Sequence, residues 1–127
     1  MKKLTKVLTT SLAAIVFGSC GPNLSTPKDT VKYCISAFES NNFSKIDKCL
    51  SQKSDYRESK DRFDNARTLI VNCKKYADKG TVYDSIDPWA DVIYEINVPG
   101  CHVGFELKQL PNKTYKLHCV YMPGRNV

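Results

Sequence analysis

The sequence lacks the short motifs that mark the common enzyme and metal-binding classes. It has no Gly-x-Ser-x-Gly elbow, no phosphate-binding loop, no His-Glu-x-x-His helix and no dinucleotide fingerprint. No two cysteines have the Cys-x-x-Cys spacing of a redox centre or a zinc knuckle, and only two histidines are present. The sequence therefore predicts no cofactor, no metal site and no catalytic residues of these classes.

The sequence also lacks an apolar run long enough to cross a bilayer, which takes roughly 20 residues. The longest apolar stretch runs only from Val7 to Phe17 and follows a basic start made by Lys2, Lys3 and Lys6. A basic start followed by a short apolar stretch is typical of an export signal. We expect this signal to span residues 1–19.

The residues that end the apolar stretch are Phe17, Gly18, Ser19 and Cys20. They resemble the bacterial lipobox, and the resemblance implies lipidation of Cys20, a tether over residues 20–25 and a protein held to a membrane in the bacterial cell envelope, on the periplasmic or surface side. Two or more acyl chains anchor a protein stably, whereas one chain binds only marginally. The alternative is an ordinary cleaved signal followed by an incidental cysteine.

Charge gives little support to nucleic-acid binding. The whole chain carries a net charge of +6, but the predicted signal holds three lysines and no acid, so the remaining 108 residues carry 16 basic and 13 acidic residues. Basic and acidic residues also alternate, as in the stretch from Lys60 to Asp64. We therefore expect a mixed, solvated surface on one domain spanning residues 26–127, with no nucleic-acid partner.

Two short helices are predicted at the start of this domain. Thr26 suits a helix cap, Pro27 suits the first helical position, and apolar residues then recur at steps of three and four through residues 27–40. The same spacing recurs over residues 43–51, after a polar turn. A third, more exposed helix is predicted between Ser54 and Arg67.

From Leu69 onward the apolar period changes to two, which predicts strands with one buried face. Alternation is clear in four segments, residues 69–74, 92–98, 101–108 and 116–122, and a further short strand is predicted at 81–83 within a connecting segment. Helices followed by an antiparallel meander indicate an α+β fold. The predicted inward face includes Tyr94, Phe105, Cys119 and Tyr121, whereas His102, Glu106 and His118 are predicted to face outward, with His118 opposite Glu106.

One disulfide has a geometric basis in the sequence. If the first two helices are antiparallel, Cys34 and Cys49 lie at the same distance from the turn and can meet. They form either a disulfide, which export would allow, or two packed thiols. The pairing of Cys73, Cys101 and Cys119 stays open, and an odd cysteine is left over if Cys20 carries lipid.

The stretch from Thr26 to Leu50 is similar to the opening of small bacterial lipoproteins of the nuclear-transport-factor-2-like superfamily, in a branch of unknown function. The matching residues are Thr26, Pro27, Asp29, Val31, Ile35, Phe38, Asn42 and Phe43. The resemblance implies a cone in which two to three helices pack on the concave face of a curved antiparallel sheet of about four strands.

Enzymes of that superfamily place an acid or a histidine base inside the cone, and the predicted inward face here has neither. We therefore expect a non-enzymatic domain that binds an envelope protein or a small apolar ligand, with Tyr94, Phe105 and Tyr121 as candidate cavity-lining residues. Two alternatives remain. The first is an enzyme of isomerase or hydrolase type that uses a tyrosine or a free cysteine, and the second is an inhibitor of an envelope-directed hydrolase such as lysozyme.

Overall fold

In the computed structural model, which describes residues 22–123, the first helix of the domain spans Pro27–Ser40 (α2), as the sequence predicts. The hydroxyl of Thr26 accepts a hydrogen bond from the backbone N–H of Asp29 at 3.1 Å and so caps the helix start. Asn41 ends the helix in the left-handed conformation, with φ of 54°, and its N–H donates to the carbonyl of Phe38.

Two short helical segments lie between α2 and α4, and a third follows α4. Helix α3 spans Phe43–Cys49, two residues shorter than predicted at its end, and a 3-10 turn, η2, spans Asp55–Arg57. Helix α4 spans Lys60–Val71, and a second 3-10 segment, η3, spans Lys74–Lys79. None of the helices within residues 22–123 has the length and apolar character needed to cross a bilayer.

The predicted strand at residues 69–74 is wrong, because α4 continues to Val71. Ser59 caps this helix by accepting from the N–H of Arg62, and Phe63, Ala66 and Ile70 form its buried face at helical spacing. Ile70 is fully buried, although the predicted alternation placed it outward. An apolar run this short fits a strand or the last turn of a helix equally well, and packing against α2 decides for the helix.

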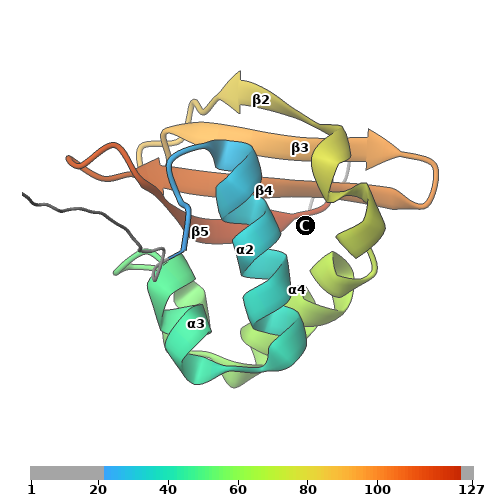
Figure 1. The fold of residues 1–127 in the computed structure, drawn as a ribbon, viewed down its shortest axis with the longest axis horizontal. Coiled ribbons are helices and arrows are strands. Elements are labelled where there is room, and N and C mark those ends of the chain that lie inside the picture. Colours follow the sequence, from blue (N-terminus) through green and yellow to red (C-terminus); the bar gives the residue numbers. More distant parts are fainter. Residues whose placement is uncertain (1–21, 124–127) are drawn as a thin grey trace, which may run out of the picture.

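The sheet has the order β2-β3-β4-β5 and is antiparallel throughout. Its strands are β2 (Gly80–Asp84), β3 (Val92–Val98), β4 (Cys101–Gln109) and β5 (Tyr115–Tyr121). The short segment predicted at 81–83 is thus the first strand of the sheet. The helices cover one face of the curved sheet, which confirms the predicted α+β architecture (Figure 1).

A β-bulge in β5 changes the predicted orientation of its last residues. The register pairs Leu107 with Leu117 but Glu106 with Cys119, so His118 is an extra residue in the strand. Directly paired residues share a face, which turns Cys119 outward with Glu106 and turns Val120 inward with Phe105. The predictions that Cys119 faces inward and that His118 lies opposite Glu106 are therefore wrong.

The two edges of the sheet differ in how they are covered. The outer edge of β5 is occupied by residues 50–56: Ser51 N–H donates to the Leu117 carbonyl at 2.8 Å, and Val120 N–H donates to the Tyr56 hydroxyl at 2.7 Å. The other edge strand, β2, is mostly exposed. Covering an edge satisfies backbone groups that would otherwise pair with another chain.

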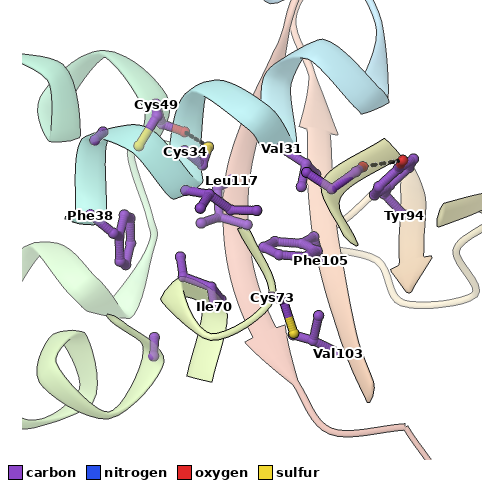
Figure 2. Close-up of a cluster of buried hydrophobic side chains, with 14 of the residues drawn as sticks. Val31, Cys34, Phe38, Cys49, Ile70, Cys73, Tyr94, Val103, Phe105 and Leu117 are labelled. Atoms are coloured by element: carbon purple, nitrogen blue, oxygen red, sulfur yellow. Dashed lines mark hydrogen bonds between the residues drawn. The ribbon is translucent and has the colours of Figure 1, made fainter. Parts of the chain in front are cut away.

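The core lies between the helices and the inner face of the sheet, and Figure 2 shows its central side chains. One disulfide joins Cys73, just after α4, to Cys101 at the start of β4, with a Cα–Cα distance of 5.4 Å. The bond links the helical layer to the sheet across 28 positions of the sequence.

The predicted disulfide between Cys34 and Cys49 is not formed. The two residues lie in contact in the core, as antiparallel α2 and α3 require, but both are free thiols. The thiol of Cys34 points at the backbone carbonyl of Cys49, at 3.9 Å, and the thiol of Cys49 donates to the carbonyl of Ile46 at 3.2 Å (Figure 2). The alternative of two packed thiols describes this pair.

Candidate ligand-binding groove

An open cavity of about 760 Å³ lies on the helical side of the molecule, between α3, η2 and α4. This volume lies in the usual range of small-ligand sites, roughly 300 to 1,000 Å³. We call it the α3–α4 groove. Its lining residues are Asn41, Phe43, Ile46, Asp47, Leu50, Tyr56, Arg57, Glu58, Ser59, Lys60, Phe63, Asp64 and Arg67.

The apolar floor of the groove rests on the core through Phe38 of α2. The rings of Phe38 and Phe63 are stacked with centroids 4.6 Å apart, and the ring of Tyr56 meets Phe38 edge-on at 6.0 Å. Phe43, at the first turn of α3, adds a ring that is 78% exposed. Most phenylalanines are buried, so a ring left this open beside a cavity is available to a ligand.

Arg57 holds the wall formed by the end of α3. Its guanidinium donates to the carbonyls of Ser51, Leu50 and Asp47 at 2.8, 2.9 and 3.1 Å, and it pairs with the Asp47 carboxylate at 2.6 Å. The last carbonyls of a helix lack partners within the helix, so this side chain caps α3. The Arg57 guanidinium also holds the pKa of the Asp47 carboxyl below its ordinary value.

Arg67 caps the end of α2 in the same way. From α4 it donates to the carbonyl of Phe38 at 2.7 Å and to the carbonyl of Glu39 at 3.3 Å. Both arginines of the groove therefore donate N–H groups to carbonyls at the ends of neighbouring helices. These hydrogen bonds fix the walls of the groove and leave fewer donors for an anionic ligand.

The charges around the groove balance. Three basic side chains, Arg57, Lys60 and Arg67, are matched by three acidic ones, Asp47, Glu58 and Asp64. Two ion pairs join members of the two sets, Arg57 with Asp47 and Lys60 with Asp64. A neutral rim over an aromatic floor favours an apolar or aromatic ligand over a polyanion.

The three predicted cavity-lining residues do not share a cavity. Tyr94 and Phe105 are fully buried in the core, where the Tyr94 hydroxyl donates to the carbonyl of Ala77 at 2.6 Å (Figure 2). Tyr121 lies on the other face of the sheet, with its ring against Gly104, where an added Cβ would be 2.3 Å from a ring carbon. Side chains fill the inner face at Tyr94 and Phe105, and none of the three residues lines the α3–α4 groove.

The outer face of the sheet carries a second cluster, around Glu106. The side chain is only 8% exposed, although the sequence predicts a solvated position. Burial first, and hydrogen bonding with the Asp87 carboxyl second, raise the pKa of Glu106 to about 7, while the indole of Trp89 acts in the opposite direction. The connection between β2 and β3, which contains Asp87 and Trp89, therefore lies against Glu106.

The thiol of Cys119 is directly across the strand pair from Glu106. Burial and the nearby Glu106 carboxyl raise the pKa of this thiol. Burial likewise raises the pKa of Cys34 well above its ordinary value. Because thiolates are the reactive form of cysteine, raised pKa values make both residues poor nucleophiles at neutral pH.

Glu106 is expected to make stability depend on pH. Its folded-state pKa of about 7 lies above the ordinary 4.5, so its contribution is fully present below pH 4.5 and is lost as the pH rises to about 7. After allowance for solvent screening, the loss is on the order of 2 kcal/mol. Urea unfolding at several pH values should show wild type losing this amount relative to Glu106→Gln, which keeps a neutral side chain at every pH.

The control for this experiment is Glu95→Gln. Glu95 lies on the same outer face of the sheet, opposite Gly104, and is less buried than Glu106. Its substitution should shift stability by a similar amount at all pH values. A pH-independent difference for Glu106→Gln as well would contradict the raised pKa of Glu106.

Asp91, two residues after Trp89, has a structural role in the β2–β3 connection. The Asp91 carboxylate accepts from the backbone N–H of Gln109 at 2.7 Å and lies 3.7 Å from the Lys108 ammonium. Within residues 22–123, no group of three or more His, Cys, Asp or Glu side chains is placed to hold a metal ion.

The predicted lipidation site, Cys20, lies outside the described residues. The sequence does not predict the groove, because Phe43, Tyr56 and Phe63 lie in segments whose apolar spacing indicates only the buried faces of helices. A usable signal was present in the arginines at 57 and 67, which stand beside those aromatics. No family model, no curated protein and no solved structure matches this chain.

Proposed function

We propose that this chain is a membrane-anchored bacterial envelope lipoprotein whose domain is a non-enzymatic binding module, and that the α3–α4 groove is its binding site. The observation that carries the binding role is the 760 Å³ groove, with Phe43 exposed at its rim and a balanced set of charges around it. The lipobox-like run ending at Cys20 supports the anchor.

The proposed ligand is apolar, either a small molecule or a side chain of an envelope protein. Aromatic rings supply the floor, and the arginine guanidiniums already bond to helix ends. Ligand sites of this type place a few polar groups around an apolar surface. The Tyr56 hydroxyl accepts from the Val120 N–H, so this ring is held in place before a ligand arrives.

An enzymatic role has weaker support. Glu106, whose pKa is raised to about 7 by burial and by the neighbouring Asp87 carboxyl, is the candidate acid of such a role. A catalytic pair also needs a substrate pocket around it, and neither residue lines the α3–α4 groove. The raised pKa of the Cys119 thiol further disfavours a cysteine nucleophile there.

The groove can be tested with the neutral, apolar fluorescent probe Nile red. We expect Phe43→Ser to weaken probe binding about five-fold, because covering part of a phenylalanine ring contributes about 1 kcal/mol. The change should not affect folding, since the ring is already exposed. Titration of each protein with the probe gives the dissociation constants.

The matched control is Tyr83→Ser. Tyr83 is also an exposed aromatic residue, but it lies on β2 and does not line the groove. Its substitution should leave probe affinity unchanged. Equal affinities for wild type and Phe43→Ser would remove the groove as the binding site.

A further inference from the structure

The β2–β3 connection carries an exposed apolar surface that the groove does not explain. Ile86, in this connection, is 97% exposed, and Trp89 is 50% exposed. Tyr83, near the end of β2, is 49% exposed and is directly across the strand pair from Ile93. We call Tyr83, Ile86 and Trp89 the apolar cap.

The apolar cap lies on the outer side of the sheet. Tyr83 pairs with Ile93, and Ile93 pairs with Glu106. Because directly paired residues share a face, Tyr83 lies on the same outer face of the sheet as Ile93 and Glu106.

Trp89 follows Ile86 in the same connection, which begins and ends at the sheet: the Ser85 N–H donates to the Asp91 carbonyl at 3.0 Å, and the Asp91 N–H donates to the Leu107 carbonyl at 2.8 Å. These backbone hydrogen bonds hold the connection beside the strands, and Ile86 is left open.

The chain enters the domain at the end of the sheet where the cap lies. The Leu24 carbonyl accepts from the N–H of Tyr115 at 2.9 Å, and Tyr115 pairs with Gln109. Gln109 in turn donates to Asp91 of the β2–β3 connection. Figure 1 shows the start of the described chain, the β2–β3 connection and the β4–β5 turn together at the left side of the fold.

The distances keep the cap near the proposed anchor. Leu24 follows Cys20 by four positions, and four fully extended steps span at most about 14 Å. Strand β5 lies two places from β3 in the sheet, which corresponds to roughly 10 Å at the usual strand spacing. A bilayer that holds a lipid on Cys20 is thus within reach of the apolar cap.

We propose that the apolar cap inserts into the interfacial region of the bilayer that holds the anchor, with Ile86 entering the acyl boundary and Trp89 lying at headgroup level. The proposal rests on the lipid anchor of the proposed function. Tryptophan favours the membrane interface, where its ring meets apolar surface and its N–H meets polar groups.

The charges around the cap indicate which lipids it meets. Asp84, Asp87 and Asp91 surround Ile86 in the sequence, and among them Asp91 is paired with Lys108. Acidic side chains are repelled by anionic headgroups. The cap therefore fits a zwitterionic surface such as phosphatidylcholine or phosphatidylethanolamine.

Insertion of the apolar cap orients the domain, and the lipid on Cys20 anchors it. Burial of one isoleucine side chain is too little for stable membrane binding by an untethered domain. Tethering raises the local concentration of the cap at the bilayer, so the same energy suffices once the lipid is in place. In this orientation the helical layer with the α3–α4 groove, on the opposite side of the sheet, faces away from the membrane.

Trp89 makes the proposal directly measurable, because it is the only tryptophan in the chain. The full, lipidated protein is reconstituted into phosphatidylcholine vesicles with or without brominated acyl chains. We expect brominated chains to quench tryptophan fluorescence at least two-fold. Ile86→Ser should reduce the quenching, while Phe43→Ser, which removes an exposed apolar residue of the groove, should leave it unchanged.

The outcomes separate the insertion from the anchor. Protein that floats with the vesicles and shows no quenching overturns the insertion and leaves the anchor standing. Protein that stays off the vesicles and carries no lipid on Cys20 overturns both. Absence of quenching together with a loss of iodide access to Trp89 as protein concentration rises assigns the cap to a second copy of the chain and overturns the insertion.

Discussion

Replacing Cys73 and Cys101 together with alanine is expected to lower the free energy of unfolding by roughly 3.5 kcal/mol. The disulfide closes a loop across 28 positions, and the chain-entropy relation gives about this value for a loop of that length. Stabilities of small domains are only about 5 to 15 kcal/mol, so the loss is a large fraction of the total. Urea unfolding of wild type and the double variant measures it.

Reductant provides the control for the disulfide. Adding dithiothreitol should destabilise wild type by about the same amount and should have no effect on the double variant. A similar reductant effect in both proteins would show that another pair carries the bond. Cys34 and Cys49, which are in contact as thiols, are the pair to suspect in that case.

Phe38→Ala is expected to cost about 4 kcal/mol. The side chain is fully buried, and its removal leaves a cavity in addition to losing apolar burial. It also supports the groove, because Phe63 stacks on it and Tyr56 meets its edge. Probe affinity should therefore fall together with stability, as both rings lose the surface that positions them.

Phe43→Ala is the matched control, since it deletes the same ring from a site that is 78% exposed. Its effect on stability should stay within about 0.5 kcal/mol, while its effect on probe affinity should resemble that of Phe43→Ser. Comparable stability losses for the two alanine variants would contradict the buried role given to Phe38.

The start of the domain follows from local sequence. The cap at Thr26, the proline after it and the apolar spacing place α2 at residues 27–40, because each signal acts within a few residues. The strands β3 and β4 are also predictable, since clear alternation and the turn at Pro99 and Gly100 define them.

Three features depend on contacts that are distant in sequence, which local patterns do not contain. The end of α4 is set by the packing of Ile70, although residues 69–74 alternate like a strand. The bulge at His118 reverses the side chains after it, and Ser51 and Ser54, more than sixty positions earlier in the chain, contact this residue. The Cys73–Cys101 bond joins two elements whose approach is visible only in the fold.

The candidate site was harder to predict than the fold. An interior cavity would follow from the resemblance to a cone-shaped family, but Tyr94 and Phe105 are packed with core side chains. The groove arises instead where α3 and α4 diverge and two arginines bond to helix ends. Glu106 becomes buried because the β2–β3 connection folds over it, a contact that alternation within β4 does not predict.

The proposed envelope role depends on the chemical state of Cys20, and mass spectrometry of the mature protein from a membrane fraction measures that state. We predict a first residue of Cys20 carrying a diacylglyceryl group, and labelling by a palmitate analogue that is lost in Cys20→Ala. A mature chain that retains Met1 and the early lysines, without lipid and in the soluble fraction, would contradict the account.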